Sequence, residues 1–134
     1  MTVTVRRDLS QPTRHIIHVR NHLVSTDMSV AEGGIDAGAS PHDLFDASLG
    51  ACKALTVLWY AQRKAMPVTD IEVLVDHDDS NERKGSYLMH AVLRVHGDLT
   101  EAQRQELLTV AQKCPVHKLM TTATVEISTT LEAA

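Results

Sequence analysis

SPHDLFDASLGACKALTVLWYAQRKA, residues 40–65, is the stretch that decides the fold, because it predicts one long helix. Ser40 suits the N-cap, Pro41 suits the first helical position, and Asp43 completes a capping-box arrangement that also favours the helix dipole. Pro67 should stop the helix, since the residue before a proline disfavours helical geometry. Apolar side chains fill most positions, so we expect this helix to be buried. The narrow polar stripe that remains consists of Asp46, Lys53, Tyr60 and Lys64.

Strands are predicted on both sides of this helix. The N-terminal stretches 2–6 and 14–20 are rich in β-branched residues, and residues 22–27 continue the meander after a turn. Residues 70–77 and 86–96 flank a charged turn and predict a β-hairpin. The second arm of that hairpin alternates between apolar and mixed positions, which is typical of an antiparallel strand with one face on the core.

A second helix and a final strand complete the predicted order. Thr100 and Gln103 form another capping box, and an apolar stripe continues from there to Cys114. Pro115 disfavours helical geometry at Cys114, so we place that cysteine in the last turn of the helix, facing the core. Residues 123–129 alternate in polarity and predict a closing strand. The result is an α+β fold.

Composition excludes several classes of function. The formal net charge is -4 and the basic residues are scattered, so we expect no nucleic-acid partner. The aromatic residues are one Trp, two Tyr and one Phe, too few for base-stacking surfaces. No stretch is apolar for long enough to span a membrane and no secretory pattern opens the chain, so we expect a cytoplasmic protein. Residues 1–134 should form a single domain, with its own core or as one subunit of an intertwined oligomer.

Cys52 and Cys114 are the only cysteines of the chain and its strongest functional candidates. Two cysteines are too few for a secreted disulfide scaffold, and in a reducing compartment a disulfide would be transient and catalytic or redox-sensing. If the thiols meet, one sulfur can attack an oxidant while the other resolves the product. Inert packing of two buried thiols is the alternative interpretation.

Both cysteines are expected on core-facing helix surfaces, where burial raises a thiol pKa and suppresses the thiolate. A reactive Cys52 therefore needs a nearby cation, and arginine suits because it stays charged at any relevant pH. Arg14 and Arg20, on the N-terminal strands or their turn, are the candidates. Lys53 follows Cys52 directly, but a rotation of about 100° on an ideal helix turns it away.

The number and spacing of the histidines suggest metal binding as another interpretation. The chain has eight, and Cys114 with His117 has half of a zinc-site spacing. Structural zinc sites usually need two such halves, and no second half accompanies this one. His18 and His22 are four apart in strand or turn sequence, where that spacing does not bring them together as a helix would. We therefore expect no metal.

Two segments together resemble the OsmC/Ohr family of thiol-dependent peroxidases. They are residues 38–68, GASPHDLFDASLGACKALTVLWYAQRKAMPV, and residues 113–131, KCPVHKLMTTATVEISTTL. The similarity is greatest to the OsmC-like branch of redox proteins. It implies an OsmC-like α+β fold with an N-terminal β-meander, a long buried central helix, a β-hairpin, a second helix and a closing strand. It also implies that two chains intertwine into a homodimer.

The resemblance implies an antioxidant peroxidase that needs no metal, flavin or haem. The Cys52 thiolate would attack the O–O bond of an organic hydroperoxide, with hydrogen peroxide as a second oxidant, and become a sulfenic acid. Cys114 would condense with the sulfenic acid, and an external dithiol of the lipoyl or thioredoxin type would reduce the disulfide. The alternative is a non-enzymatic protein that binds a small ligand in an apolar cavity at the dimer interface.

The supporting residues depart from the family pattern. Better-studied members place a glutamate ten residues before the reactive cysteine, paired with an arginine that holds the thiolate. His42 occupies that position here and Asp43 follows it. His42 is a candidate orienting group or an exposed first-turn residue, and Asp43 is a candidate whose alternative role is capping. Ten helical residues rise about 15 Å, so His42 could reach only the Cys52 of a partner chain. Of the two candidate arginines, we expect Arg20 to be the one that holds the Cys52 thiolate.

Overall fold

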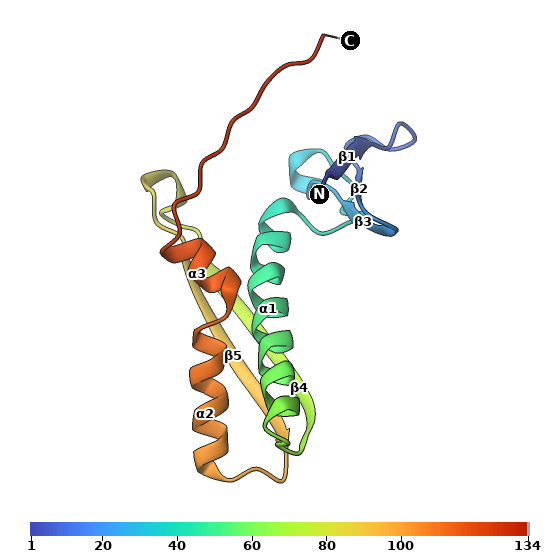
Figure 1. Cartoon of the computed structure of the whole chain (residues 1–134). Coiled ribbons are helices and arrows are strands. Elements are labelled where there is room, and N and C mark those ends of the chain that lie inside the picture. The colour runs from blue at the N-terminus through green and yellow to red at the C-terminus, as the bar shows by residue number, and fades with distance from the viewer. Residues whose placement is uncertain (134) are drawn as a thin grey trace. The chain divides into compact units, whose positions relative to one another are not determined.

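The computed structural model of the protein describes residues 1–133 (Figure 1). The chain forms two compact units, Met1–Ala47 and Ser48–Ala134, and each is described by itself. The predicted long helix is present as α1, Pro41–Arg63, which begins in the first unit and continues in the second.

The first unit contains a three-stranded antiparallel sheet in the order β1-β2-β3. The strands β1, Val3–Arg7, β2, His15–Val19, and β3, His22–Thr26, confirm the predicted meander. A short 3-10 helix, η1, Val30–Glu32, follows in the loop that leads to α1. Arg20, in the turn between β2 and β3, has a φ of 53°, a left-handed conformation that is uncommon for a residue other than glycine.

Asp27 organises the loop after β3. One carboxylate oxygen accepts hydrogen bonds from Oγ1 of Thr13 at 2.6 Å and from the N–H of Met28 at 2.8 Å. The other oxygen accepts from the N–H groups of Ile35 at 3.3 Å and Ala37 at 3.0 Å. These donors, the Thr13 hydroxyl foremost, stabilise the carboxylate and lower the pKa of Asp27 from 3.8 to about 2.

We expect Asp27 to make the stability of the protein depend on acid pH. Because its folded pKa of about 2 lies below its unfolded pKa, the carboxylate stabilises the fold above pH 4, and that contribution is lost as the pH falls towards 2. Asp27→Asn should lower the melting temperature at neutral pH and weaken its decline in acid. Thermal denaturation across this pH range measures both effects, with the exposed neighbour Asp36 changed to Asn as control. Equal acid profiles for wild type and Asp27→Asn would contradict the assignment.

The second unit is built on a β-hairpin. The strands β4, Val68–Asp78, and β5, Leu88–Gly97, pair antiparallel, as predicted, and the turn between them holds the 3-10 helix η2, Glu82–Lys84. Exposed and half-buried residues alternate strictly along β5, so one face of that strand turns to the core. The helix α2, Glu101–Gln112, begins at the capping box predicted from Thr100. Figure 1 shows α1 and α2 on the same face of the hairpin.

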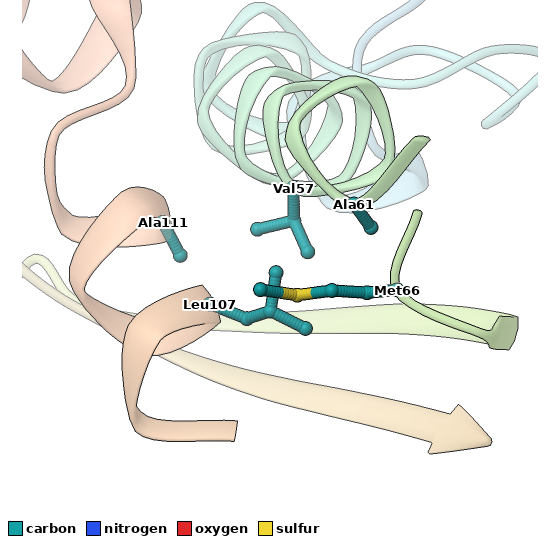
Figure 2. Close-up of a cluster of buried hydrophobic side chains, with 5 residues drawn as sticks. All are labelled: Val57, Ala61, Met66, Leu107 and Ala111. Atoms are coloured by element: carbon teal, nitrogen blue, oxygen red, sulfur yellow. The ribbon is translucent and has the colours of Figure 1, made fainter. Parts of the chain in front are cut away.

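Five buried side chains form a cluster in the core of the second unit (Figure 2). Val57 and Ala61 of α1 face Leu107 and Ala111 of α2, and Met66, just after α1, lies between the helices and the hairpin. Val57 and Leu107 are fully buried. Half-buried residues that pack against this cluster include four from the hairpin, namely Val68, Ile71, Leu93 and Val95.

The expected burial of α1 holds for one face only. Leu55 and Leu58 are 67% and 37% exposed, whereas Lys53, predicted on the polar stripe, is 7% exposed. The hairpin and α2 cover a single face of α1, and that face includes the lysine. Although α1 is long, neither it nor any other helix within residues 1–133 has the length and apolar character that a membrane span requires.

Cys114 faces the core, as predicted, but it does not lie in the last turn of the preceding helix. The helix α2 ends at Gln112, and Cys114 is instead the N-cap of a separate helix that was not predicted, α3, Pro115–Thr121. Pro115 explains the division, because its ring suits the first position of a helix but provides no N–H to continue the previous one.

The closing strand predicted at residues 123–129 does not form in the described chain. Residues 124–133 have no regular secondary structure. Alternating polarity gives a segment the side chains of a strand, but a strand also needs a neighbour to complete its main-chain hydrogen bonds. The described part of the chain provides no such neighbour for this segment.

Candidate active site

The two thiols meet inside the second unit. Cys52 lies on α1, Cys114 lies at the junction between α2 and α3, and the Cys52 thiol lies close enough to Cys114 to raise its pKa. Both are free cysteines. Cys114 is fully buried, whereas Cys52 is half-buried. The structure therefore brings together the two residues that the sequence singled out and leaves one of them within reach of solvent.

The backbone at the start of α3 acts on both sulfur atoms. The N–H of Val116 donates to Sγ of Cys52 at 3.5 Å. The backbone N–H of His117 faces Cys114 closely enough to lower the pKa of its thiol. Sγ of Cys52 also lies 3.9 Å from Oγ1 of Thr56, one helical turn further along α1. The start of α3 and the side of α1 therefore surround the two sulfur atoms with polar groups.

Opposing effects act on the Cys114 thiol. Burial raises the pKa of Cys114, because a thiolate there is poorly solvated, and the neighbouring Cys52 thiol raises it as well. The His117 N–H and the positive charge of Lys53 lower it. The pKa is raised overall, so Cys114 is mostly a thiol at neutral pH. Chemistry that needs its thiolate depends on the two groups that lower the pKa.

Lys53 belongs to the site, although helical periodicity alone places it on the polar stripe, turned away from Cys52. Its Nζ donates to the backbone carbonyl of Ala111 at 2.8 Å and lies 3.1 Å from Nδ1 of His117. An ammonium group has no lone pair, so it is the donor in both contacts and Nδ1 of His117 is the acceptor. The lysine links α1 to the ends of α2 and α3, next to the thiols.

Pro115 explains why a lysine lies beside the backbone carbonyl of Ala111. In a continuous helix the carbonyl of Ala111 would accept from the N–H of residue 115, but proline has no N–H. A buried carbonyl without a partner is unfavourable, and the Lys53 ammonium provides the missing donor. A lysine within an apolar helix and a proline just after another helix were the two signals in the sequence that could have indicated this contact.

Three other predicted site residues lie in the first unit. Arg20 is exposed and donates to Sδ of Met1 at 3.7 Å. His42 and Asp43 lie in the exposed first turn of α1. Asp43 forms the predicted capping box, since its N–H donates to Oγ of Ser40 at 3.1 Å and its Oδ2 accepts from the N–H of Ser40 at 2.9 Å. Roles for Arg20, His42 and Asp43 in catalysis stay predictions.

Arg14, the other candidate arginine, is held within the first unit. Its Nη1 forms an ion pair with Oδ2 of Asp8 at 3.1 Å, and its Nη2 donates to Oγ of Ser25 at 2.8 Å. These contacts give Arg14 a structural role between the strands of the meander.

Among residues 1–133, no three histidine, cysteine, aspartate or glutamate side chains gather as a metal ion requires. His117, part of the predicted half-site with Cys114, contacts Lys53 through its ring.

In this α+β fold, a long helix and a shorter one pack on a β-hairpin. A pair of free thiols lies where the two helices meet, so the protein has a dithiol site. The sequence model of OsmC-like proteins matches residues 33–130, most of the chain. The chain belongs to the OsmC-like protein family.

Solved structures share this fold. An OsmC-like protein from Mycoplasma pneumoniae is 16% identical with a TM-score of 0.73, covering 90% of this chain and 86% of that one. The organic hydroperoxide resistance protein OsmC from Legionella pneumophila is 15% identical with a TM-score of 0.64, covering 91% and 90%. The organic hydroperoxide resistance protein OhrB of Bacillus subtilis is 24% identical with a TM-score of 0.59, covering 90% of each chain. No curated protein sequence matches the chain.

Proposed function

We propose that this protein is a cysteine-based peroxidase that reduces organic hydroperoxides. The observation that carries the proposal is the contact between Cys52 and Cys114, two free thiols held together in the second unit. Family membership supports the substrate class, because similar structures include proteins named for organic hydroperoxide resistance. A reducing, cytoplasmic compartment would keep both thiols free until an oxidant arrives.

Cys52 is the attacking residue in this proposal. It is half-buried and Cys114 is fully buried, so an oxidant reaches Cys52 first. The thiolate sulfur of Cys52 attacks one oxygen of the hydroperoxide, an S–O bond forms and the O–O bond breaks. The leaving alkoxide takes a proton and departs as an alcohol, and Cys52 becomes a sulfenic acid.

Cys114 resolves the sulfenic acid. Its thiolate attacks the Cys52 sulfur, the S–S bond forms, and the departing hydroxide takes a proton to become water. An external dithiol, of the lipoyl or thioredoxin type, then reduces the disulfide and becomes a disulfide itself. Over one cycle a hydroperoxide and a dithiol yield an alcohol, water and a disulfide, so no metal or organic cofactor is needed.

We propose a homodimer as the working state. Leu55 and Trp59 on α1 are 67% and 55% exposed, and residues four apart in a helix lie on the same face. Large apolar side chains that gather on an exposed face favour association with another surface. In such a dimer, His42 at the first turn of the partner's α1 is the proposed orienting group for Cys52, Arg20 is the proposed cation, and Asp43 caps the helix.

One mass-spectrometric experiment tests assembly and chemistry together. Native spectra of the untreated protein should show two chains. After one equivalent of an organic hydroperoxide, denatured non-reducing spectra should show the loss of two hydrogens per chain together with both free thiols, and hydrogen peroxide should act more slowly. Cys114→Ser should instead accumulate a sulfenic acid on Cys52 that oxidises further. Two unreacted thiols in the wild type would refute the peroxidase and favour ligand binding, and a mass of one chain would refute the dimer.

A further inference from the structure

We propose that Lys53 is an electrostatic positioning residue that sets how readily Cys114 becomes a thiolate, and that it thereby controls closure of the Cys52–Cys114 disulfide. His117 holds the lysine in place. The proposal deepens the proposed function and rests on it for its biological meaning, although the charge effect itself can be measured without a peroxide.

Within residues 1–133, Lys53 is a buried cation without an anionic partner. Only 7% of the residue is exposed, and neither of its two polar contacts, the Ala111 carbonyl and the His117 ring, carries a negative charge. Buried charges in proteins are normally paired with an opposite charge, because an unpaired one is unfavourable in a poorly hydrated interior. A negative charge that forms nearby would therefore be stabilised by Lys53.

Cys114 is the group on which that negative charge can form. It is fully buried at the same junction of helices, and the charge of Lys53 acts on it, lowering a pKa that burial raises. His117 connects the two residues, since its ring lies 3.1 Å from Nζ of Lys53 and its backbone belongs to the first turn of α3, which begins at Cys114. The lysine thus has a fixed position relative to the thiol.

The resolving step is where this charge matters. Only the thiolate of Cys114 attacks the sulfur of an oxidised Cys52, so the rate of disulfide closure follows the thiolate fraction. Loss of the Lys53 charge should lower that fraction and prolong the life of the sulfenic acid on Cys52.

Lys53 could instead serve only to cap the Ala111 carbonyl. A capping role would make its removal costly to stability but would leave the pH dependence of Cys114 unchanged. The two roles are separated by Lys53→Gln, which keeps an N–H donor without the charge, and by Lys53→Arg, which keeps the charge. Lys118→Met is the matched control, because it removes one positive charge from an exposed position on α3.

The experiment uses a dipyridyl disulfide, with release of pyridinethione followed by stopped-flow absorbance from pH 5 to 10. Cys52 attacks the reagent and releases a first pyridinethione, leaving a mixed disulfide on Cys52. Cys114 then attacks the Cys52 sulfur and releases a second. The pH dependence of the second release reports the ionisation of Cys114.

We expect Lys53→Met and Lys53→Gln to move the midpoint of the second release to higher pH by about one unit, which is about a tenfold slower second step at neutral pH. Lys53→Arg and Lys118→Met should retain the wild-type midpoint. If Lys53→Met does not fold, as judged by circular dichroism, Lys53→Gln decides. A wild-type midpoint in the neutral variants, or an equal shift in Lys118→Met, would overturn the role of Lys53.

Failure of this proposal and failure of the peroxidase proposal look different. A wild type that releases both pyridinethiones but leaves hydroperoxide untouched would overturn the peroxidase alone, provided that the neutral Lys53 variants still shift the midpoint. A wild type that consumes hydroperoxide, with neutral variants that do not shift the midpoint, would overturn only the role of Lys53.

Discussion

Cys52→Ser should abolish hydroperoxide consumption, with a loss of about a thousandfold or more in turnover, because the hydroxyl of serine is a far weaker nucleophile than a thiolate. The substitution replaces one atom on a half-buried helical side chain, so the fold should persist. The measurement is the disappearance of an organic hydroperoxide in the presence of excess dithiol.

Cys114→Ser is the informative control for that experiment. It also removes a thiol from the junction of the helices, but it leaves Cys52 to react. It should consume about one equivalent of hydroperoxide per chain to form the sulfenic acid and about one more as over-oxidation to the sulfinic acid inactivates it. Turnover by Cys52→Ser at the wild-type rate would show that the chemistry lies elsewhere.

Leu107→Ala should cause the largest loss of stability among single substitutions in the second unit. The side chain is 0% exposed and packs with Val57, Ala61 and Met66 in the core. Removing it leaves a cavity and should lower the free energy of unfolding by about 3 kcal/mol, a large part of the about 5 to 15 kcal/mol typical of a folded protein.

The neighbouring Leu108 provides the matched control. It is the same residue type on the same helix but is 41% exposed. Leu108→Ala should therefore cost less than about 1 kcal/mol. Urea denaturation of both variants at one fixed protein concentration measures the difference, since association would otherwise change the apparent stability. Equal losses at the two positions would contradict the packing of α2.

Local patterns in the sequence predicted most of the fold. The capping boxes at Ser40 and Thr100 give the starts of α1 and α2, and the alternation along β5 gives its core-facing side. These features depend on residues close together in the chain, which is why they can be read from the sequence.

What could not be predicted depends on contacts between distant segments. The closing segment at residues 123–129 has the alternation of a strand but meets no partner strand in the described chain. The sequence places Lys53 on a solvated polar stripe. Its burial depends on the backbone carbonyl of Ala111, on another helix, which accepts a hydrogen bond from it. The proximity of Cys52 and Cys114 could not be predicted for the same reason. Helical spacing places each cysteine on a core-facing surface but does not show that the two meet.

Pro115 gives positions 53 and 115 a shared evolutionary constraint. A proline at 115 without a donor at 53 would leave the Ala111 carbonyl unsatisfied, and a lysine at 53 without that proline would compete with an ordinary amide for the same oxygen. Either substitution alone should be disfavoured, whereas a simultaneous change at both positions should be tolerated. We therefore expect the two positions to covary among homologues, although they are far apart in the chain and neither is one of the reacting thiols.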